Sequence, residues 1–249
     1  MNKLTIMAAS LPDTPPLDFI EAAASAGYDG IGLRLHKSPS FPRWQDWLED
    51  AGLKRDVKRA LTYSGLEMNE ILSYYITPDV DLESMAPSLE YGAKLGATYL
   101  WITSRDDDWS RQCDSIGKFC DMAASFDLTV MLGTPVNNLS PIQTAFRVVD
   151  EVRRPNCTVC VGVGLYLRGG NLEDLQGRDR RLLPLIHFND GTPEADVAAL
   201  LDELPVNVVV SVESPNRTGR HYTALQWCQH TLAATRQFLE AYRTRPPTR

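Results

Sequence analysis

The sequence lacks the features that mark several large classes of protein. No apolar run approaches the roughly 18 to 20 residues of a membrane-spanning helix, and the first six residues lack the apolar stretch of a secretory signal. Basic residues are also scarce, because 25 Lys and Arg stand against 32 Asp and Glu and give a formal net charge of −7. A general nucleic-acid binder needs a basic surface. We therefore expect a soluble, cytoplasmic protein that binds neither nucleic acid nor a membrane.

Cysteine is sparse, and the five cysteines are odd in number. They imply no disulfide framework, and in a reducing compartment we expect free thiols. Cys157 and Cys160 have the spacing of a zinc or redox pair, but no second pair completes a zinc site. In a strand, residues three apart also face opposite sides. We therefore interpret both as small buried side chains.

Short apolar runs alternate with amphipathic stretches along the whole chain. Eight runs have the pattern of strands, and they cover residues 4–11, 29–35, 66–75, 97–104, 128–135, 157–167, 185–190 and 207–214. Several are apolar almost throughout, which is typical of parallel strands buried on both faces. Helical patterns lie between them, at 17–27, 81–96, 109–127, 141–152, 194–204 and 222–242. Residues 171–183 are charged and irregular, and there the pattern supports a helix only weakly.

This alternation predicts an α/β fold, a single (β/α)8 TIM barrel over residues 1–249 with a frayed tail at 244–249. An open doubly wound sheet is the alternative. It needs a glycine-rich phosphate-binding turn after the first strand, and residues 8–13 contain no glycine. The barrel is therefore the predicted fold.

Several helix boundaries carry recognisable end signals. Asp81 and Ser140 lie where a helix N-cap is expected, and Gly27 and Gly96 lie where a helix ends. The acidic run 106–108 resembles a metal loop, but we interpret it as the start of the fourth helix, where negative charge is favoured.

The polar residues at the carboxyl ends of the strands are the first candidates for chemistry, since TIM-barrel active sites lie there. Glu213 ends the apolar run 208–212, where burial and nearby charges tune a carboxylate for acid/base work. His187 and Asn189 share a face because strands have a period of two, and Asp190 follows them. A solvated strand end for Glu213 and a core position for His187 are the structural alternatives.

Further candidates lie on the second, third, fourth and sixth strands. Glu70 interrupts the third apolar run, and it is interpreted either as a functional carboxylate or as the ion-pair partner of Arg34 on the neighbouring strand. Arg34 and Arg168 are candidate clamps for an anion or a hydroxyl group. His36 and Trp101 are further candidates for substrate contact.

These strand ends resemble those of the xylose-isomerase-like TIM-barrel family, which includes sugar-phosphate isomerases and epimerases and endonuclease IV. The resemblance is carried by residues 19–34, 89–97, 167–170, 186–190 and 210–213, in an order and spacing that cover nearly the whole chain. The DNA-repair branch is excluded by the net charge of −7 and by the presence of only four histidines, too few for a multi-metal site.

The family resemblance also implies where a divalent metal would bind. Members typically hold it with a Glu after strand five, an Asp on strand six, a His on strand seven and a Glu on strand eight. His187 and Glu213 match the last two positions, whereas the first two fall on Gly133 and Gly162 and the accessory histidine falls on Leu165. One imidazole and one carboxylate hold a hard cation poorly, so we expect no cofactor. The alternative is a metal held by relocated ligands: Glu70, His187, Asp190 and Glu213.

The resulting hypothesis is a metal-independent isomerase, epimerase, lyase or cyclase that moves protons on a small to medium hydroxy-carbonyl substrate. Glu213, or Glu70 opposite it, is the expected base, and His187 is the expected proton donor or shuttle. The expected substrate contacts are Arg34, His36, Trp101, Arg168, Asn189 and Asp190. A catalytically silent barrel that binds a small molecule or a partner is the alternative from another class.

Two further predictions concern shape and assembly. Glycine at positions 133 and 162 removes side-chain volume and predicts a wide cavity, suited to a bulkier or more apolar substrate than a small sugar. Its expected lining is Trp101, Tyr74, Tyr75, Tyr166 and Met131. Trp227 on the last helix, and Trp44 with Trp47 on the second, are candidate contacts of a homodimer, with simple packing as the alternative.

Overall fold

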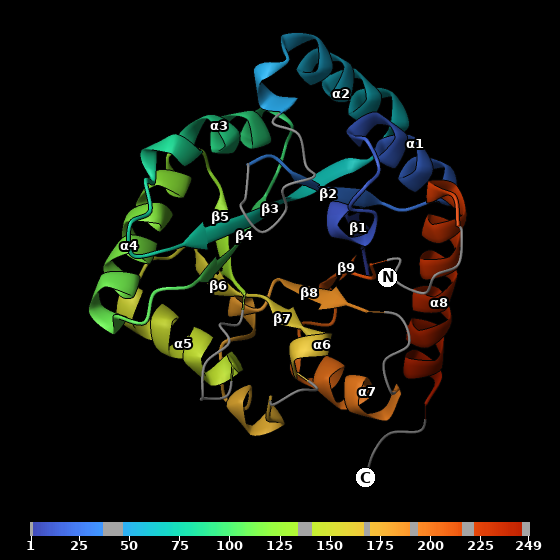
Figure 1. The fold of residues 1–249 in the computed structure, drawn as a ribbon. Helices are drawn as coiled ribbons and strands as arrows, with labels where there is room; N and C mark the ends of the chain where they lie inside the picture. The colour runs from blue at the N-terminus through green and yellow to red at the C-terminus, as the bar shows by residue number, and fades with distance from the viewer. Residues whose placement is uncertain are drawn as a thin grey trace.

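The computed structural model describes residues 2–36, 47–133, 141–166, 170–189, 194–215 and 222–245. Strands occupy the centre and helices surround them (Figure 1). The strands are β1 (Leu4–Met7), β2 (Gly30–Arg34), β3 (Glu67–Ile76), β4 (Tyr99–Ser104), β5 (Thr129–Leu132), β6 (Cys157–Val159), β7 (Val161–Gly162), β8 (Leu185–Phe188) and β9 (Val209–Val212). The α-helices are α1 (Pro16–Ala26), α2 (Ala51–Ser64), α3 (Ala86–Lys94), α4 (Trp109–Ala124), α5 (Pro141–Val152), α6 (Val163–Tyr166), α7 (Glu194–Glu203) and α8 (Ala224–Thr244).

The sheet closes on itself through β6 and β7. The strand order is β6-β5-β4-β3-β2-β1-β9-β8-β7, and every pair is parallel. Only Cys160 separates β6 from β7, and its N–H donates to the carbonyl of Leu132 on β5 at 3.0 Å. The two short strands therefore fill one place in the wall, and the predicted eight-stranded TIM barrel is confirmed.

Two predicted strands are shorter than expected. The run predicted at 157–167 ends as a strand at Gly162, and α6 begins at the next residue. The run predicted at 4–11 ends at Met7 and continues as a 3-10 turn, Ala8–Ser10. A short apolar run has no periodicity that separates a buried strand from a buried helical turn, which explains both errors.

Apolar side chains fill both faces of the barrel wall. The larger cluster lies between the strands and the surrounding helices, and a smaller one consists of Met131, Cys160 and Leu185 with Tyr99, Trp101 and Val209 packed against it. This arrangement explains the nearly continuous apolar strands of the sequence. All five cysteines are buried and free, as predicted.

The helix-end signals at Gly27, Gly96 and Asp108 are confirmed, whereas Asp81 binds the amides of the 3-10 turn Glu83–Met85 that precedes α3 and is not the N-cap of the helix itself. Gly27 and Gly96 have φ of 92° and 90°, a left-handed backbone that glycine adopts readily and that ends a helix. The Asp81 side chain accepts from the amides of Glu83 and Ser84, and Asp108 accepts from the amide of Arg111 at the start of α4. Ser140 lies outside the described residues.

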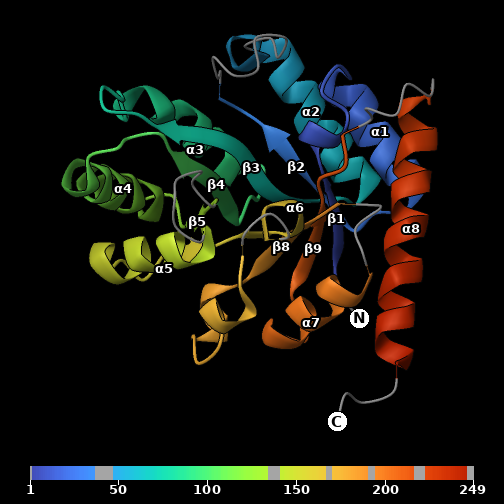
Figure 2. The ribbon, with the colours of Figure 1, turned by 60° about the horizontal axis from the view of Figure 1, so that its bottom comes forward.

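The last helix, α8, packs beside the first helix, α1 (Figure 2). Trp227 of α8 is 2 % exposed and lies inside the chain itself, so its predicted role in a dimer contact is wrong. Trp47 begins a 3-10 turn (Trp47–Glu49) ahead of α2 rather than lying in a helix, and Trp44 is outside the described residues. Among the helices that the structure describes, none combines the length and the apolar character of a membrane span.

Candidate functional site

A buried carboxylate, Glu70, lies on β3 inside the barrel. The β2–β3 ladder pairs Ile31 with Met68 and then Gly32 with Glu70, so it skips Asn69 and brings Glu70 opposite a glycine. A Cβ on Gly32 would lie 2.6 Å from the Cγ of Glu70. Glycine at position 32 therefore provides the space that the Glu70 side chain occupies.

Both carboxylate oxygens of Glu70 take part in hydrogen bonds. The Oε2 atom lies 2.9 Å from Nε2 of His187 on β8, and Oε1 accepts from the hydroxyl of Ser211 on β9. The first contact joins side chains 117 residues apart in the sequence. Glu70 therefore pairs with His187 rather than with Arg34, and the ion pair proposed from the sequence as the alternative is wrong.

The contacts of His187 favour the charged form of its ring. Burial lowers the pKa of this imidazole, but the charges and hydrogen bonds of Cys160 and Glu70 outweigh burial and hold the pKa well above 6.5. We attribute the net rise to Glu70, because burial raises the pKa of the Cys160 thiol and keeps that group neutral. The pKa shift therefore favours a protonated His187 ring in its hydrogen bond to Glu70 in the barrel interior.

Glu213 directly follows β9 and faces the other side of the same ring. Its Oε2 lies 3.9 Å from Nδ1 of His187. The Glu213 side chain is 37 % exposed, whereas the side chains of His187 and Glu70 are 2 % and 0 % exposed. The three residues therefore form a series that leads from the buried interior to the open end of the barrel, and only Glu213 reaches solvent.

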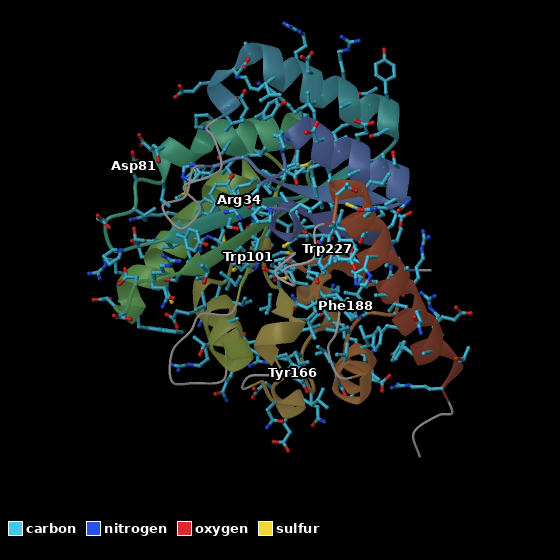
Figure 3. The ribbon with its side chains drawn as sticks, turned by 45° about the vertical axis from the view of Figure 1, so that its right-hand side comes forward. Arg34, Asp81, Trp101, Tyr166, Phe188 and Trp227 are labelled. Atoms are coloured by element: carbon cyan, nitrogen blue, oxygen red, sulfur yellow. The ribbon has the colours of Figure 1, made fainter. Side chains whose placement is uncertain are left out.

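Arg34, at the end of β2, adds a second buried cation. Burial lowers the pKa of Arg34 to about 10, while the charges of Tyr75 and Glu213 act in the opposite direction. The guanidinium therefore stays charged at neutral pH and lies within the electrostatic reach of Glu213. Arg34 and Trp101 both lie within the ring of helices, whereas Asp81 lies at its edge (Figure 3).

Trp101 occupies the space beside Gly133. A Cβ at position 133 would lie 2.6 Å from three atoms of the Trp101 indole, Cε2, Cζ2 and Nε1. The same indole lies 5.9 Å from the ring of His187, centroid to centroid, at 45°. The prediction that glycine 133 widens the cavity is therefore wrong at this position, because the indole fills the space.

The structure places some of the remaining predicted contact residues, and others lie outside the described residues. His36 stacks on Tyr74 with ring centroids 5.4 Å apart. Tyr74 itself is fully buried and shares a 2.8 Å hydrogen bond with Ser88 of α3, so it points into the outer layer and its predicted role in the pocket wall is wrong. Arg168 and Asp190 lie outside the described residues.

Asn189 contacts protein groups at both ends of its amide. Its Nδ2 donates to the backbone carbonyl of Glu213, and its Oδ1 accepts from the amide of Gly164 at 3.2 Å. These contacts support a role in holding the end of β9, while the substrate contact proposed from the sequence stays a prediction.

Sequence reasoning missed Ser211 and Cys160. Both are buried and contact the Glu70–His187 pair, Ser211 through its hydroxyl and Cys160 through His187. Ser211 precedes Glu213 by two residues and therefore shares its face of the strand, which is a signal that the sequence carries. Cys160 has no such signal, because it lies at the break between β6 and β7.

Within the described part of the chain, the positions at which the family resemblance implies a divalent metal do not fit one, and Asp190 of the relocated ligand set lies outside that part. Gly133 and Gly162 offer no side-chain donor, and at Gly133 the Trp101 indole takes the space of a ligand. Nε2 of His187 is bonded to Glu70 rather than available to a cation. No group of three or more His, Cys, Asp or Glu residues in the described parts of the chain has an arrangement that would hold a metal ion.

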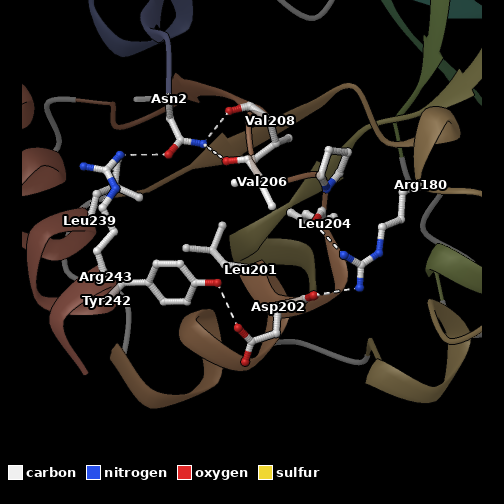
Figure 4. Close-up of a pocket in the computed structure, with 11 residues that line it drawn as sticks. Asn2, Arg180, Leu201, Asp202, Leu204, Val206, Val208, Leu239, Tyr242 and Arg243 are labelled. Atoms are coloured by element: carbon white, nitrogen blue, oxygen red, sulfur yellow. Dashed lines mark hydrogen bonds between the residues drawn. The ribbon is translucent and has the colours of Figure 1, made fainter. Parts of the chain in front are cut away.

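A separate cavity of about 240 Å³ lies at the opposite end of the barrel, where β1 and β9 begin (Figure 4). The Asn2 side chain donates to the carbonyls of Val206 and Val208, and Arg180 donates to the carbonyls of Asp202 and Leu204. These bonds tie the N-terminal segment to the loop before β9 and the turn before β8 to the end of α7, and we assign this cavity a structural role.

The fold has close relatives among solved structures. A xylose isomerase domain protein from Salmonella typhimurium LT2 superposes with a TM-score of 0.74 at 14 % identity, over 96 % of this chain and 97 % of that one. The IolI protein, solved with a zinc atom, gives 0.74 at 17 % identity, over 98 % and 100 %. D-allulose 3-epimerase from Methylomonas sp., solved with D-allulose, gives 0.72 at 14 % identity, over 95 % and 96 %.

Sequence comparison assigns the family. No curated protein matches the chain. The family model described as xylose isomerase-like TIM barrel matches residues 20–236, which is most of the chain. The chain therefore belongs to the xylose isomerase-like TIM barrel family.

Proposed function

We propose that this protein is an enzyme of the isomerase, epimerase or lyase type that moves a proton next to a carbonyl group without a metal ion. The observation that carries the proposal is the series Glu70–His187–Glu213, in which two charged groups are buried and the third reaches the open end of the barrel. A buried histidine with a shifted pKa beside a carboxylate at a strand end is typical of acid/base sites.

Glu213 has the role of the base in this proposal. Its carboxylate takes a proton from the carbon beside the substrate carbonyl and returns it to the neighbouring carbon on the same face; an epimerisation would need a second proton donor on the other face. The His187 imidazolium, 3.9 Å away, balances the charge of Glu213 before the transfer. Arg34 supplies positive charge near the same carboxylate and would stabilise the enolate oxygen that develops.

Glu70 holds His187 rather than acting on substrate. Its side chain is fully buried, and both of its oxygens are bonded to His187 and Ser211. We therefore favour Glu213 over Glu70 as the base.

The family and the site support one substrate class. A neighbour in the fold was solved with the ketose D-allulose, which supports a hydroxy-carbonyl compound. The Trp101 indole in place of a ligand side chain supports a substrate with an apolar face.

The test is solvent exchange followed by proton NMR. A panel of ketoses, aldoses and aromatic hydroxy-ketones is incubated with the protein in D2O, and loss of the carbon-bound proton beside the carbonyl is measured. Glu213→Gln should slow exchange by about 10² to 10⁴-fold. Glu240→Gln, a change at an exposed position on α8, is the matched control and should have no effect.

The alternatives give different results in the same assay. Exchange that disappears with chelator and returns with manganese, zinc or magnesium would contradict the metal-free mechanism. A compound that binds with equal affinity to the wild type and Glu213→Gln, with no exchange in either, would indicate a binding barrel.

A further inference from the structure

The backbone around Glu213 lies just beyond the end of the sheet. Val212 is the last residue of β9 in register with its neighbours, Ile6 on β1 and Phe188 on β8. After it, the Glu213 amide still donates to the carbonyl of Phe188 at 2.8 Å. The following polar groups of the backbone have no strand partner and depend on side chains.

Asn189 donates to the carbonyl of Glu213 itself, and two buried side chains from distant parts of the chain are partners of the groups on either side of it. The Ser10 hydroxyl donates to the carbonyl of Val212 at 2.9 Å and accepts from the amide of Ser214 at 3.0 Å. The indole Nε1 of Trp227, on α8, donates to the carbonyl of Ser214 at 2.8 Å. Ser10 is 0 % and Trp227 is 2 % exposed.

We propose that Ser10 and Trp227 are positioning residues that fix Glu213 at the open end of the barrel. They hold the residues on both sides of Glu213, one from the turn after β1 and one from the last helix. This inference rests on the proposed role of Glu213 as the base.

The physical reason is the small tolerance of proton transfer for misplacement. A shift of about 1 Å in a reacting group can cost on the order of 10²-fold in rate. The Glu213 side chain is 37 % exposed. Its own contacts therefore hold it less firmly than those of a buried side chain would. Rigid backbone on both sides therefore sets where the carboxylate lies relative to His187.

The variants are Ser10→Ala and Trp227→Phe, which remove one hydrogen-bonding group each and keep most of the side-chain volume. Tyr28→Phe is the matched control, because it removes a buried 2.8 Å hydrogen bond to Thr231 of the same helix without touching residues 212–214. If Trp227→Phe fails to fold, Ser10→Ala, which deletes a single oxygen atom, carries the test.

Two readouts decide the result. In the exchange assay, the two variants should lower kcat by about 10 to 100-fold with KM within about twofold, while Tyr28→Phe leaves kcat unchanged. In amide hydrogen exchange, the Glu213 amide should exchange at least about tenfold faster in both variants. Neither substitution removes the bond from this amide to Phe188, so faster exchange reports movement of Glu213 itself.

The outcomes separate this inference from the proposed function. If Glu213→Gln reduces exchange but Ser10→Ala and Trp227→Phe behave like Tyr28→Phe, the positioning role is overturned and the function stands. If no compound reacts, or Glu213→Gln keeps full turnover, the proposed function fails. Amide exchange then decides: faster exchange at Glu213 supports the positioning role, and unchanged exchange overturns it.

Discussion

The two ends of the barrel both contain clusters of charged residues, but they use charge differently. On the side of the open end, Glu70 and His187 lie buried in the barrel interior and are hydrogen-bonded to each other. At the opposite end, Asp202 accepts from Tyr242 at 2.8 Å and pairs with Arg245, and its side chain is 42 % exposed. The first cluster excludes water, and the second is open to it.

This difference determines what each cluster contributes. Removing one partner of a buried ion pair leaves an uncompensated charge, whereas an exposed pair is screened by solvent and contributes little. A buried pair is weak evidence for stability by itself, since burying the two charges is costly. We infer that Glu70 and His187 serve chemistry, and that the exposed cluster only ties the end of α8 to α7.

The largest expected effect is from Glu70→Gln. The amide keeps a hydrogen bond but removes the negative charge beside His187, so the free energy of unfolding should fall by about 3 kcal/mol. Urea unfolding at pH 6 measures it. A change below about 1 kcal/mol would remove the distinction between the two ends of the barrel.

A smaller loss is expected from Gly133→Ala. The added Cβ would lie 2.6 Å from the Trp101 indole and force it to move, which should cost about 1 to 3 kcal/mol of unfolding free energy. Gly117→Ala is the control, because its Cβ would be 3.9 Å from Val152, an ordinary contact, inside helix α4. There, alanine should be neutral or stabilise by up to about 1 kcal/mol.

The pH dependence of stability should depend on His187. Its pKa in the folded protein lies well above the value of 6.5 in the unfolded chain, so the folded state holds the proton more tightly. The stabilisation is fully present below pH 6.5 and is lost as the pH rises from there through the folded pKa, at up to about 1.4 kcal/mol per pH unit. Urea unfolding from pH 6 to 7.5, below the range in which unfolded cysteines ionise, should show this slope, and it should disappear in His187→Gln. An equal slope in both proteins would argue against a charged His187.

The smallest effect is expected from Asp202→Asn at the opposite end. The exposed ion pair with Arg245 should contribute less than about 1 kcal/mol to the free energy of unfolding, and less still in high salt. Unfolding at low and high sodium chloride measures both. A loss as large as that of Glu70→Gln would show that this cluster does more than hold the end of α8 against α7.

The sequence predicted the fold better than it predicted the contacts. Period-two and apolar patterns located every strand of the barrel, because these patterns depend on local chemistry and on burial. The patterns failed at Gly162, where one short run changes from strand to helix. They also failed at Tyr74, whose ring points outward to α3 instead of into the barrel.

For the site, the sequence identified Glu70, His187, Arg34 and Glu213 as separate candidates at strand ends. It paired Glu70 with its neighbour in the sheet, Arg34, because adjacent strands are the only proximity that a sequence indicates. The observed partner, His187, lies across the barrel interior.

What the sequence by itself determined is the architecture and the kinds of groups at the open end, since both follow from residue type and spacing. Only the tertiary structure decided which groups meet, how deeply each is buried and which of them reaches solvent. The physical reason is that the barrel brings together residues from β3, β8 and β9, which are more than a hundred positions apart in the case of Glu70 and His187. The burial that fixes their charges exists only once the barrel closes.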